Sequence, residues 1–449
     1  MFFFSTIYIF RGMALNKDVD VICLDLDHCL ARYRIHALQR MIYACLCRGI
    51  VEQCGAPSAA FLLASPFARG VPLPEDAVEG VSDFTGEGGE GLDVTDVGAW
   101  GLGWAPHFCR KGLVLDGARG DVLQLGPEGQ VLGAFHGFQA LSPSQVDLRY
   151  GAVYWGFELL QAQQRSGEFL QLTTYFDTPA AVSFAQWVEH EDAVRQQAAA
   201  APAQAQAGSS GGAAAGSSPP SAGYTHLLTG HIRVFNHIFD NDAAFPTGRG
   251  GFFAALRMHP SLYIASRQAA ACALQALRTS GHPARICVVT NSSPIFARFM
   301  LRAALGPSYA SLFHALVYCS AKPLWFSASA SASPPPMTPL EGAADGKEFL
   351  GGTARALCER LACGGRGLFA GDHVVTDVVA AAQCPVGAWT TVAVVEELDA
   401  AAQEGGGWAV QGPWGDYRAT YFTGTLLCKH ATLITSDVTE VLQALAAQG

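Results

Sequence analysis

Four short runs of apolar and β-branched residues constrain the fold of this chain most strongly, because each run stops abruptly at polar residues or glycine. A continuous apolar run of this length predicts a strand that is buried on both faces. The four predicted strands are Val19–Leu24, Ala284–Val289, Ala315–Cys319 and Gly367–Ala370. Such strands are typical of a parallel sheet that is covered by helices.

Two helical patterns accompany these strands. The stretch His36–Cys54 carries apolar residues at helical spacing and suits the first crossover, and the Ala-rich stretch Ser266–Leu277 precedes the second strand. This alternation predicts an α/β fold with a doubly wound parallel sheet. Elsewhere, Val122–Leu125 and Gln130–Phe135 flank a Gly-Pro-Glu-Gly turn, which predicts a β-hairpin.

Charge argues against one class of protein, and the cysteines indicate the compartment. The formal net charge is −10, and 15% of the residues are charged, against about 25% in an average domain. This argues against binding to nucleic acid through a basic surface. The thirteen cysteines form no C-x-x-C pair and predict reduced, mostly buried thiols. We therefore expect a cytoplasmic protein, or one inside an organelle.

The N-terminal run Met1–Phe10 is apolar but too short to span a bilayer, which needs about 20 residues. It also lacks the basic region and cleavage site of a signal peptide. Either Met13 is the true start, or the run is a short targeting or disordered tail. No membrane association is expected from it.

The first strand ends in a D-x-D motif formed by Asp25 and Asp27. At the carboxyl edge of a parallel sheet, two such carboxylates can converge on one cation and one phosphoryl group. One carboxylate can attack phosphorus if Mg²⁺ offsets the repulsion between anions, and the other can act as acid and base. A lone D-x-D motif is also common in solvated or capping loops.

Polar residues follow the second and third strands as well. Thr290 and Asn291 carry small donors that suit phosphate oxygens, and they equally suit a helix N-cap. Lys322 follows the third strand and is one of only five lysines in the chain. Its compact ammonium group can hold a nucleophilic carboxylate and a phosphate together.

Two further aspartates follow the fourth strand. Gly371 permits a sharp backbone turn, after which Asp372 and Asp377 are candidate Mg²⁺ ligands. We favour Asp372 as a direct ligand. Asp377 is either a second ligand or a residue at a helix start that orients one.

The motifs D-x-D, T-N-S, K-P and G-D-x-x-x-x-D occur in this order at four strand ends, which is more specific than any one of them. The set resembles the haloacid dehalogenase-like phosphohydrolases and, within them, the cytosolic 5′-nucleotidase family. Arg110–Asp116, His136-Gly137 and Phe176–Ala180 add to the likeness. It extends over most of residues 18 to 435 and is greatest to the "5′-nucleotidase domain-containing" subgroup.

The resemblance implies a Mg²⁺-dependent phosphomonoesterase that hydrolyses nucleoside 5′-monophosphates through an aspartyl-phosphate. Asp25 would be the nucleophile and Asp27 the acid and base. Thr290 and Asn291 would bind the phosphate, and Lys322 would clamp it.

The same resemblance implies the metal site. Mg²⁺ would be held by Asp25, the backbone carbonyl of Asp27, and Asp372, with Asp377 supporting it. The partner would be a small phosphate ester, in practice a nucleotide, and a homo-oligomer is compatible with this reading.

The family fold is a five-stranded parallel sheet between helices, with a cap inserted after the first motif. Here 265 positions separate Asp25 from Thr290, whereas a crossover needs only a dozen or more. A cap is the natural occupant, and its closure would exclude water. Three segments are low in complexity or rich in glycine, Gly70–Gly103, Ala198–Gly223 and Phe326–Pro339, and we expect mobile surface insertions there.

These arguments divide the chain into six segments. They are the first part of the haloacid dehalogenase-like core (18–70), a Gly-rich acidic insertion (71–103), an α+β cap (104–197), a low-complexity linker (198–223), the second part of the core (224–410, with a low-complexity insertion at 326–345) and a C-terminal extension (411–449).

Two departures from the family pattern leave alternatives open. Cys29 stands where D-x-D-x-T motifs have threonine, which removes a good hydroxyl donor beside the nucleophile loop. The stretch Asp240-Asn241-Asp242 lacks the arginine of the nucleotide-reading motif in purine-selective relatives. The alternatives are a phosphatase of another phosphate ester and a catalytically weak protein that binds a nucleotide or a partner.

Overall fold

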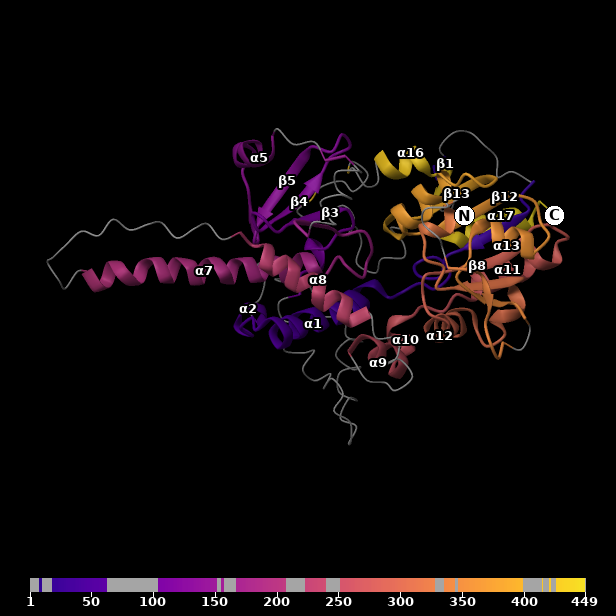
Figure 1. The fold of residues 1–449 in the computed structure, drawn as a ribbon, viewed down its shortest axis with the longest axis horizontal. Coiled ribbons are helices and arrows are strands. Elements are labelled where there is room, and N and C mark those ends of the chain that lie inside the picture. The colour runs from indigo at the N-terminus through magenta and orange to yellow at the C-terminus, as the bar shows by residue number, and fades with distance from the viewer. Residues whose placement is uncertain are drawn as a thin grey trace, which may run out of the picture. The chain divides into compact units, whose positions relative to one another are not determined.

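The structure is a computed structural model. It describes residues 8–9, 18–62, 104–151, 155–156, 167–206, 223–239, 251–327, 335–343, 346–398, 414, 420 and 425–448. The chain divides into two compact units (Figure 1). Unit 1 consists of residues 1–35, 241–411 and 415–449, and unit 2 of residues 36–240 and 412–414.

Unit 1 is built on a nine-stranded sheet in the order β1-β14-β13-β12-β2-β8-β9-β11-β10. All neighbours from β14 to β11 pair in parallel, and β1 and β10 add antiparallel edges. The strands are β1 (Tyr8–Ile9), β2 (Val21–Leu24), β8 (Arg285–Val289), β9 (Ala315–Tyr318), β10 (Thr338–Pro339), β11 (Glu348–Leu350), β12 (Arg366–Gly371), β13 (Ala388–Val394) and β14 (Leu433–Thr435).

The four predicted strands are confirmed as β2, β8, β9 and β12, with ends that shift by one or two residues. The sheet has more parallel strands than the five that the resemblance implies. Strand β2 lies at its centre, between β12 and β8, and all four of its residues are fully buried. Cys23 on one face and Leu24 on the other are both covered, which explains the continuous apolar run.

Helices connect these strands. Helix α12 shows how the sequence sets their ends, because Ser293 accepts a hydrogen bond from the amide of Phe296 and Pro294 occupies the first turn. Longer helices of unit 1 are α9 (Gly251–Met258), α11 (Gln268–Thr279), α12 (Pro294–Leu305), α13 (Ala354–Arg360) and α17 (Val438–Ala446). Short helical turns are α10 (Pro260–Tyr263), η4 (Tyr309–Leu312), η5 (Leu324–Phe326), η6 (Val374–Val379), α14 (Ala380–Ala382), η7 (Glu396–Leu398) and α16 (Cys428–His430).

Unit 2 contains a five-stranded antiparallel sheet in the order β6-β5-β4-β3-β7. The predicted hairpin is confirmed as β4 and β5. The strands are β3 (Leu113–Asp116), β4 (Asp121–Leu125), β5 (Val131–His136), β6 (Gln139–Ala140) and β7 (Phe169–Gln171), and the helices are α1 (Ile35–Cys54), α2 (Ala59–Leu62), η2 (Pro106–Phe108), α5 (Pro143–Tyr150), α7 (Ala180–Gln206) and α8 (Thr225–Phe239).

The predicted helix His36–Cys54 forms as α1, but its expected role as the first crossover on the parallel sheet is wrong. It belongs to unit 2. There the hydroxyl of Tyr43 donates to Gln186 of α7 at 2.7 Å, and Gln39 donates to Thr178 at 2.8 Å. Helical spacing identified the buried face of α1 but not the element that covers it.

A histidine joins three elements of unit 2. Nδ1 of His136 on β5 lies 2.7 Å from Asp121 on β4, and Nε2 lies 2.8 Å from Asp192 on α7. The hydroxyl of Tyr224 also donates to Asp192. The hydrogen bond with Asp121 raises the pKa of His136, although burial acts in the opposite direction. His136 thus ties α7 to the sheet.

Helices and strands extend into two of the segments that we expected to be mobile insertions. Helix α7 continues to Gln206, inside the expected linker at 198–223. Phe326, the first residue of the expected insertion at 326–345, is buried in the core, and β10 pairs with β11. Residues 71–103, 207–222 and 240–250 lie outside the described residues, and with them Asp240-Asn241-Asp242.

Within the described part of the chain, none of the helices combines the length and the apolar character that crossing a membrane requires.

Candidate active site

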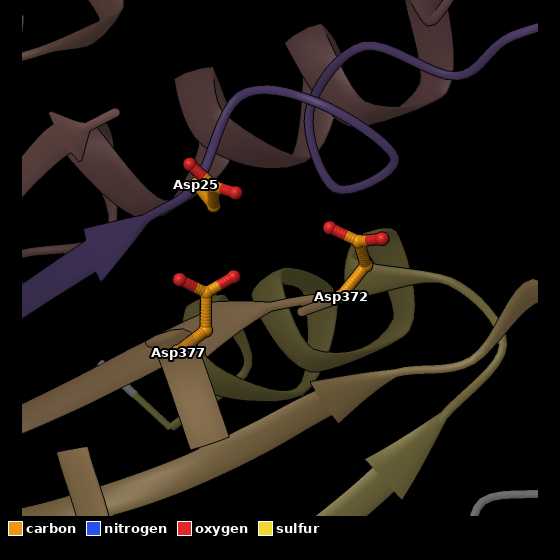
Figure 2. A group of neighbouring side chains, drawn as sticks. All are labelled: Asp25, Asp372 and Asp377. Atoms are coloured by element: carbon orange, nitrogen blue, oxygen red, sulfur yellow. The ribbon is translucent and has the colours of Figure 1, made fainter. Parts of the chain in front are cut away.

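The carboxyl ends of β2 and β12 bring three aspartates together in unit 1. Asp25 follows β2 directly, and its amide donates to the carbonyl of Ala370 on β12 at 2.8 Å. Asp372 follows β12, and Asp377 lies in the π-helical turn η6. One carboxylate oxygen from each residue lies within 4.8 Å of the others. Figure 2 shows the three side chains gathered at one end of these strands, with Asp377 pointing toward Asp25.

Lys322 joins two of these carboxylates. Its Nζ atom lies 2.7 Å from Oδ1 of Asp25 and 2.8 Å from Oδ1 of Asp377. Burial alone would lower the pKa of Lys322, but the two carboxylates raise it above its ordinary value. The residue is therefore a permanent cation at neutral pH, enclosed beside the candidate nucleophile.

Asn291 positions the turn that carries Lys322. Its Oδ1 atom accepts hydrogen bonds from the amide of Lys322 at 2.7 Å and from the hydroxyl of Ser320 at 2.9 Å. Its Nδ2 atom donates to the carbonyl of Lys322 at 3.1 Å. The side chain of Asn291 thus cross-links the ends of β8 and β9.

Thr290 is buried at the end of β8. Its amide donates to the carbonyl of Val317 on β9 at 3.0 Å, and its Oγ1 atom accepts a hydrogen bond from the amide of Ser292 at 3.1 Å. A hydroxyl that accepts one bond still has its own hydrogen to donate. Thr290 therefore combines a fixed position with a donor.

Gly371 is required for space at this site rather than for a special backbone angle. A Cβ atom at this position would clash with Oδ2 of Asp377. The amide of His373 donates to that same oxygen at 3.1 Å, and Nδ1 of His373 accepts hydrogen bonds from the first amides of η6. The prediction of a sharp turn at Gly371 thus had the wrong physical reason, since close packing against Asp377 is what excludes a side chain.

The charge balance of the site favours a divalent cation. When all three are ionised, Asp25, Asp372 and Asp377 carry two more negative charges than Lys322 offsets. Burial raises the pKa of Asp25, Lys322 lowers it, and the other carboxylates raise it further. Since Mg²⁺ binds carboxylate oxygens, the donor set fits this ion. A bound divalent cation would remove the mutual repulsion of the carboxylates.

Asp27 is held by two hydroxyl groups. Tyr33 donates to its Oδ1 atom at 2.6 Å, and Ser292 donates to its Oδ2 atom at 3.0 Å. Burial raises the pKa of Tyr33 well above its ordinary value, and Asp27 adds to the effect. The phenol therefore remains a donor over the whole physiological range.

Cys29 is buried and anchors the D-x-D loop. Its Sγ atom donates to the carbonyl of Ala370 at 3.5 Å, the same carbonyl that accepts the amide of Asp25. Burial raises the pKa of the thiol, so it stays protonated. The thiol of Cys29 thus serves as a weak donor to β12.

Tyr33 was not found by sequence reasoning. It lies six residues beyond Asp27 and reaches it because the loop folds back through the bridge between Asp27 and Ala31. No local pattern signals such a return. Ser292 was visible as part of the T-N-S motif, but its contact with Asp27 depends on the neighbouring positions of β2 and β8.

Comparison with known proteins decides the family. The sequence profile of the 5′ nucleotidase family matches residues 99–404, more than half of the chain. This chain belongs to the 5′-nucleotidase family. The matched region includes Thr290, Lys322, Asp372 and Asp377, whereas Asp25 and Asp27 precede it.

Two curated members of related sequence carry the name 5′-nucleotidase domain-containing protein 1. The human protein is 23% identical over 318 residues, which cover 70% of this chain and 56% of that protein. The Bos taurus protein is 24% identical over 394 residues, which cover 84% of this chain and 72% of that protein. This 5′-nucleotidase family chain therefore aligns with just over half the length of its human relative.

Proposed function

We propose that this chain is a haloacid dehalogenase-like phosphomonoesterase that hydrolyses nucleoside 5′-monophosphates with the help of Mg²⁺. Membership of the 5′-nucleotidase family indicates a hydrolase that acts on phosphate monoesters. The observation that carries the proposal is the buried cluster of Asp25, Asp372 and Asp377 at one sheet edge, with Lys322 paired to Asp25 and Asp377. Ligands of open α/β sheets bind at this edge.

Asp25 is the proposed nucleophile. Lys322 pairs with its Oδ1 atom, which orients the carboxylate and leaves Oδ2 to attack phosphorus. The new bond joins Oδ2 to phosphorus, the bond to the leaving alkoxide breaks, and an aspartyl-phosphate results. Water then attacks that phosphorus and releases inorganic phosphate. Lys322 would also pair with the transferred phosphoryl oxygens.

Asp27 is the proposed acid and base. Tyr33 donates a hydrogen bond to its Oδ1 atom and Ser292 donates one to its Oδ2 atom, and together they hold the carboxylate in place. Either hydroxyl can also rotate and accept a hydrogen bond from the protonated acid. The carboxyl group would pass its proton to the leaving alkoxide and take a proton back from water.

Asp25, the backbone carbonyl of Asp27, and Asp372 would hold Mg²⁺, with Asp377 supporting it. When bound, the ion offsets the repulsion between the nucleophile and the phosphate ester. Thr290 would donate its hydroxyl hydrogen to a phosphate oxygen. Asn291 has a second Nδ2 hydrogen for the same purpose, in addition to the one that holds the Lys322 turn.

Unit 2 is the proposed cap. Its antiparallel sheet and helices interrupt unit 1 between Ile35 and Asn241, directly after the D-x-D loop. Insertions at this point supply substrate contacts and exclude water when they close. The α+β composition of unit 2 supports this assignment.

The decisive experiment measures inorganic phosphate released from a panel of nucleoside monophosphates and other phosphate esters, with and without Mg²⁺. We expect turnover that requires Mg²⁺ and that Asp25→Asn abolishes. Asp18→Asn is the matched control, because Asp18 lies in unit 1 with its side chain 68% exposed. Failure of every ester to react faster with the wild type than with Asp25→Asn would refute the proposal.

A further inference from the structure

Helix α13 ends in a turn that brings two cysteines together. The amide of Cys363 donates to the carbonyl of Cys358 at 3.1 Å, and the amide of Ala362 donates to the carbonyl of Glu359 at 3.2 Å. Ala362 has a left-handed backbone with φ of 47°. These features define the Schellman motif, which is frequently accompanied by a contact between the side chains at the positions of Cys358 and Cys363.

The two sulfur atoms lie at the same end of this turn. Sγ of Cys363 donates to the carbonyl oxygen of Cys358 at 3.7 Å, and each thiol shifts the pKa of the other. The backbone hydrogen bond between the two residues also keeps their Cα atoms close, which a disulfide requires. The turn therefore places the two cysteines where a disulfide can be tested.

Solvent reaches one member of the pair more easily than the other. Cys363 is partly exposed, between the exposed residues Ala362 and Gly364, whereas Cys358 is 8% exposed and packs in the core of unit 1. The hydrogen bond with Cys358 lowers the pKa of Cys363, and the same bond, together with burial, raises the pKa of Cys358. Cys363 is thus the more reactive thiol.

We propose that Cys358 and Cys363 form a reversible disulfide when the protein meets hydrogen peroxide. The sulfur of Cys363 attacks one peroxide oxygen, the O–O bond breaks, and the first water leaves as Cys363 becomes a sulfenic acid. The sulfur of Cys358 then attacks the sulfur of Cys363, the S–O bond breaks, and the second water leaves. The two thiols lose two electrons and two protons, and one peroxide is reduced to two waters.

Two other thiols lie near this pair but are shielded from the oxidant. Cys23 and Cys287 face each other on β2 and β8, and both are fully buried. Cys287 is close enough to influence the pKa of Cys358. Because peroxide must reach a thiol before it can oxidise it, the first disulfide forms at the α13 turn rather than between the strands.

The sequence makes this disulfide easy to detect. Arg355, Arg360 and Arg366 place the two cysteines in separate tryptic peptides, Ala356–Arg360 and Leu361–Arg366. The full chain is treated with hydrogen peroxide, its remaining thiols are alkylated, and the digest is analysed by mass spectrometry. We expect a linked pair of these peptides whose mass is two hydrogens below their sum. Dithiothreitol should separate them again.

Variants make the assignment specific. Cys363→Ser should eliminate the linked pair, whereas Cys384→Ser, at another partly buried thiol beside the same core, should leave it unchanged. Exposed Cys272 reports that the peroxide dose is sufficient. The proposal is overturned if Cys358 and Cys363 are both recovered in the alkylated form, and hence unoxidised, after a peroxide dose that oxidises Cys272. Recovery of Cys358 linked to Cys287, or of Cys363 as a sulfinic acid beside an alkylated Cys358, would overturn it as well.

Discussion

The hydroxyl of Tyr33 donates a 2.6 Å hydrogen bond to Oδ1 of Asp27. This bond fixes the carboxylate that we propose as acid and base, from a residue that would not itself touch the substrate. Tyr33 is therefore a positioning residue, and its contribution should depend on how much the leaving group needs a proton.

Tyr33→Phe should slow hydrolysis of nucleoside monophosphates about tenfold, equivalent to about 1.4 kcal/mol. The loss should be smaller for p-nitrophenyl phosphate, because its leaving group departs with little protonation. Steady-state rates on both substrates test this. Tyr309→Phe is the control, since Tyr309 is a buried tyrosine of the same unit outside the site. An equal loss on both substrates would indicate a general structural defect instead.

Lys322→Met should reduce kcat by on the order of 10²- to 10³-fold, because it removes a fixed charge from the reacting centre. It also leaves Asp25 and Asp377 without their shared ammonium group. Mg²⁺ should then raise the melting temperature of the variant more than that of the wild type. Thermal unfolding with and without Mg²⁺ measures this, with Lys347→Met as the control. An unchanged Mg²⁺ shift would contradict the placement of the ion among these carboxylates.

Gly371→Ala should destabilise the protein by about 1–3 kcal/mol and reduce activity, because the new methyl group would displace the Asp377 carboxylate. The matched substitution is Gly133→Ala on β5, where an added Cβ meets no atom within 4 Å. Denaturant unfolding and phosphate release measure the two effects. If both variants behave alike, close packing at Gly371 has no functional role.

Cys29→Ser tests whether the missing hydroxyl limits the enzyme. A serine hydroxyl is a stronger donor to the carbonyl of Ala370 than the thiol at 3.5 Å, and it adds no volume. We expect kcat to rise several-fold, whereas Cys29→Ala should lower it. Cys29→Thr supplies a hydroxyl as well but adds a methyl group at a position that is 1% exposed. Binding of nucleotide without turnover in wild type, Ser and Thr variants alike would favour a binding protein.

His136 should make the stability of unit 2 depend on pH. Its pKa is raised in the folded state, chiefly by the hydrogen bond with Asp121, so the folded protein binds a proton that the unfolded chain releases near pH 6.5. The stabilisation is complete below pH 6.5 and is lost as the pH rises through the raised value. Denaturant unfolding of wild type and His136→Gln between pH 5.5 and 9 tests this. The difference between them should shrink toward high pH, and a constant difference would contradict the linkage.

Sequence reasoning found the four strand ends of the site because buried parallel strands leave a continuous apolar run with an abrupt end. It missed β11, β13 and β14 of the same sheet. Strands β11 and β14 have only three residues each, which carry little pattern, and β13 begins with the stretch Ala388–Thr391, where two threonines interrupt the apolar run. It also assigned α1 to the parallel sheet instead of unit 2, because helical periodicity shows which face of a helix is buried but not which element covers that face.

Within the site, residue types and order were sufficient to predict the acidic cluster and its lysine. The contacts that organise them were not visible. Asn291 was predicted as a phosphate ligand, yet its side chain also holds the Lys322 turn through three hydrogen bonds. Such contacts depend on the register of neighbouring strands, which a single sequence does not encode locally.

The central position of β2 also determines the order in which the protein can assemble on the ribosome. Its two neighbours, β8 and β12, are synthesised only after about 260 and 340 further residues. At roughly 5–20 residues per second, β2 waits at least about 13 s for its first partner. Unit 2 is translated in full during that interval apart from residues 412–414. The strand that leads into the candidate nucleophile is thus made early and completed late, which makes it a segment that a nascent-chain chaperone would need to protect.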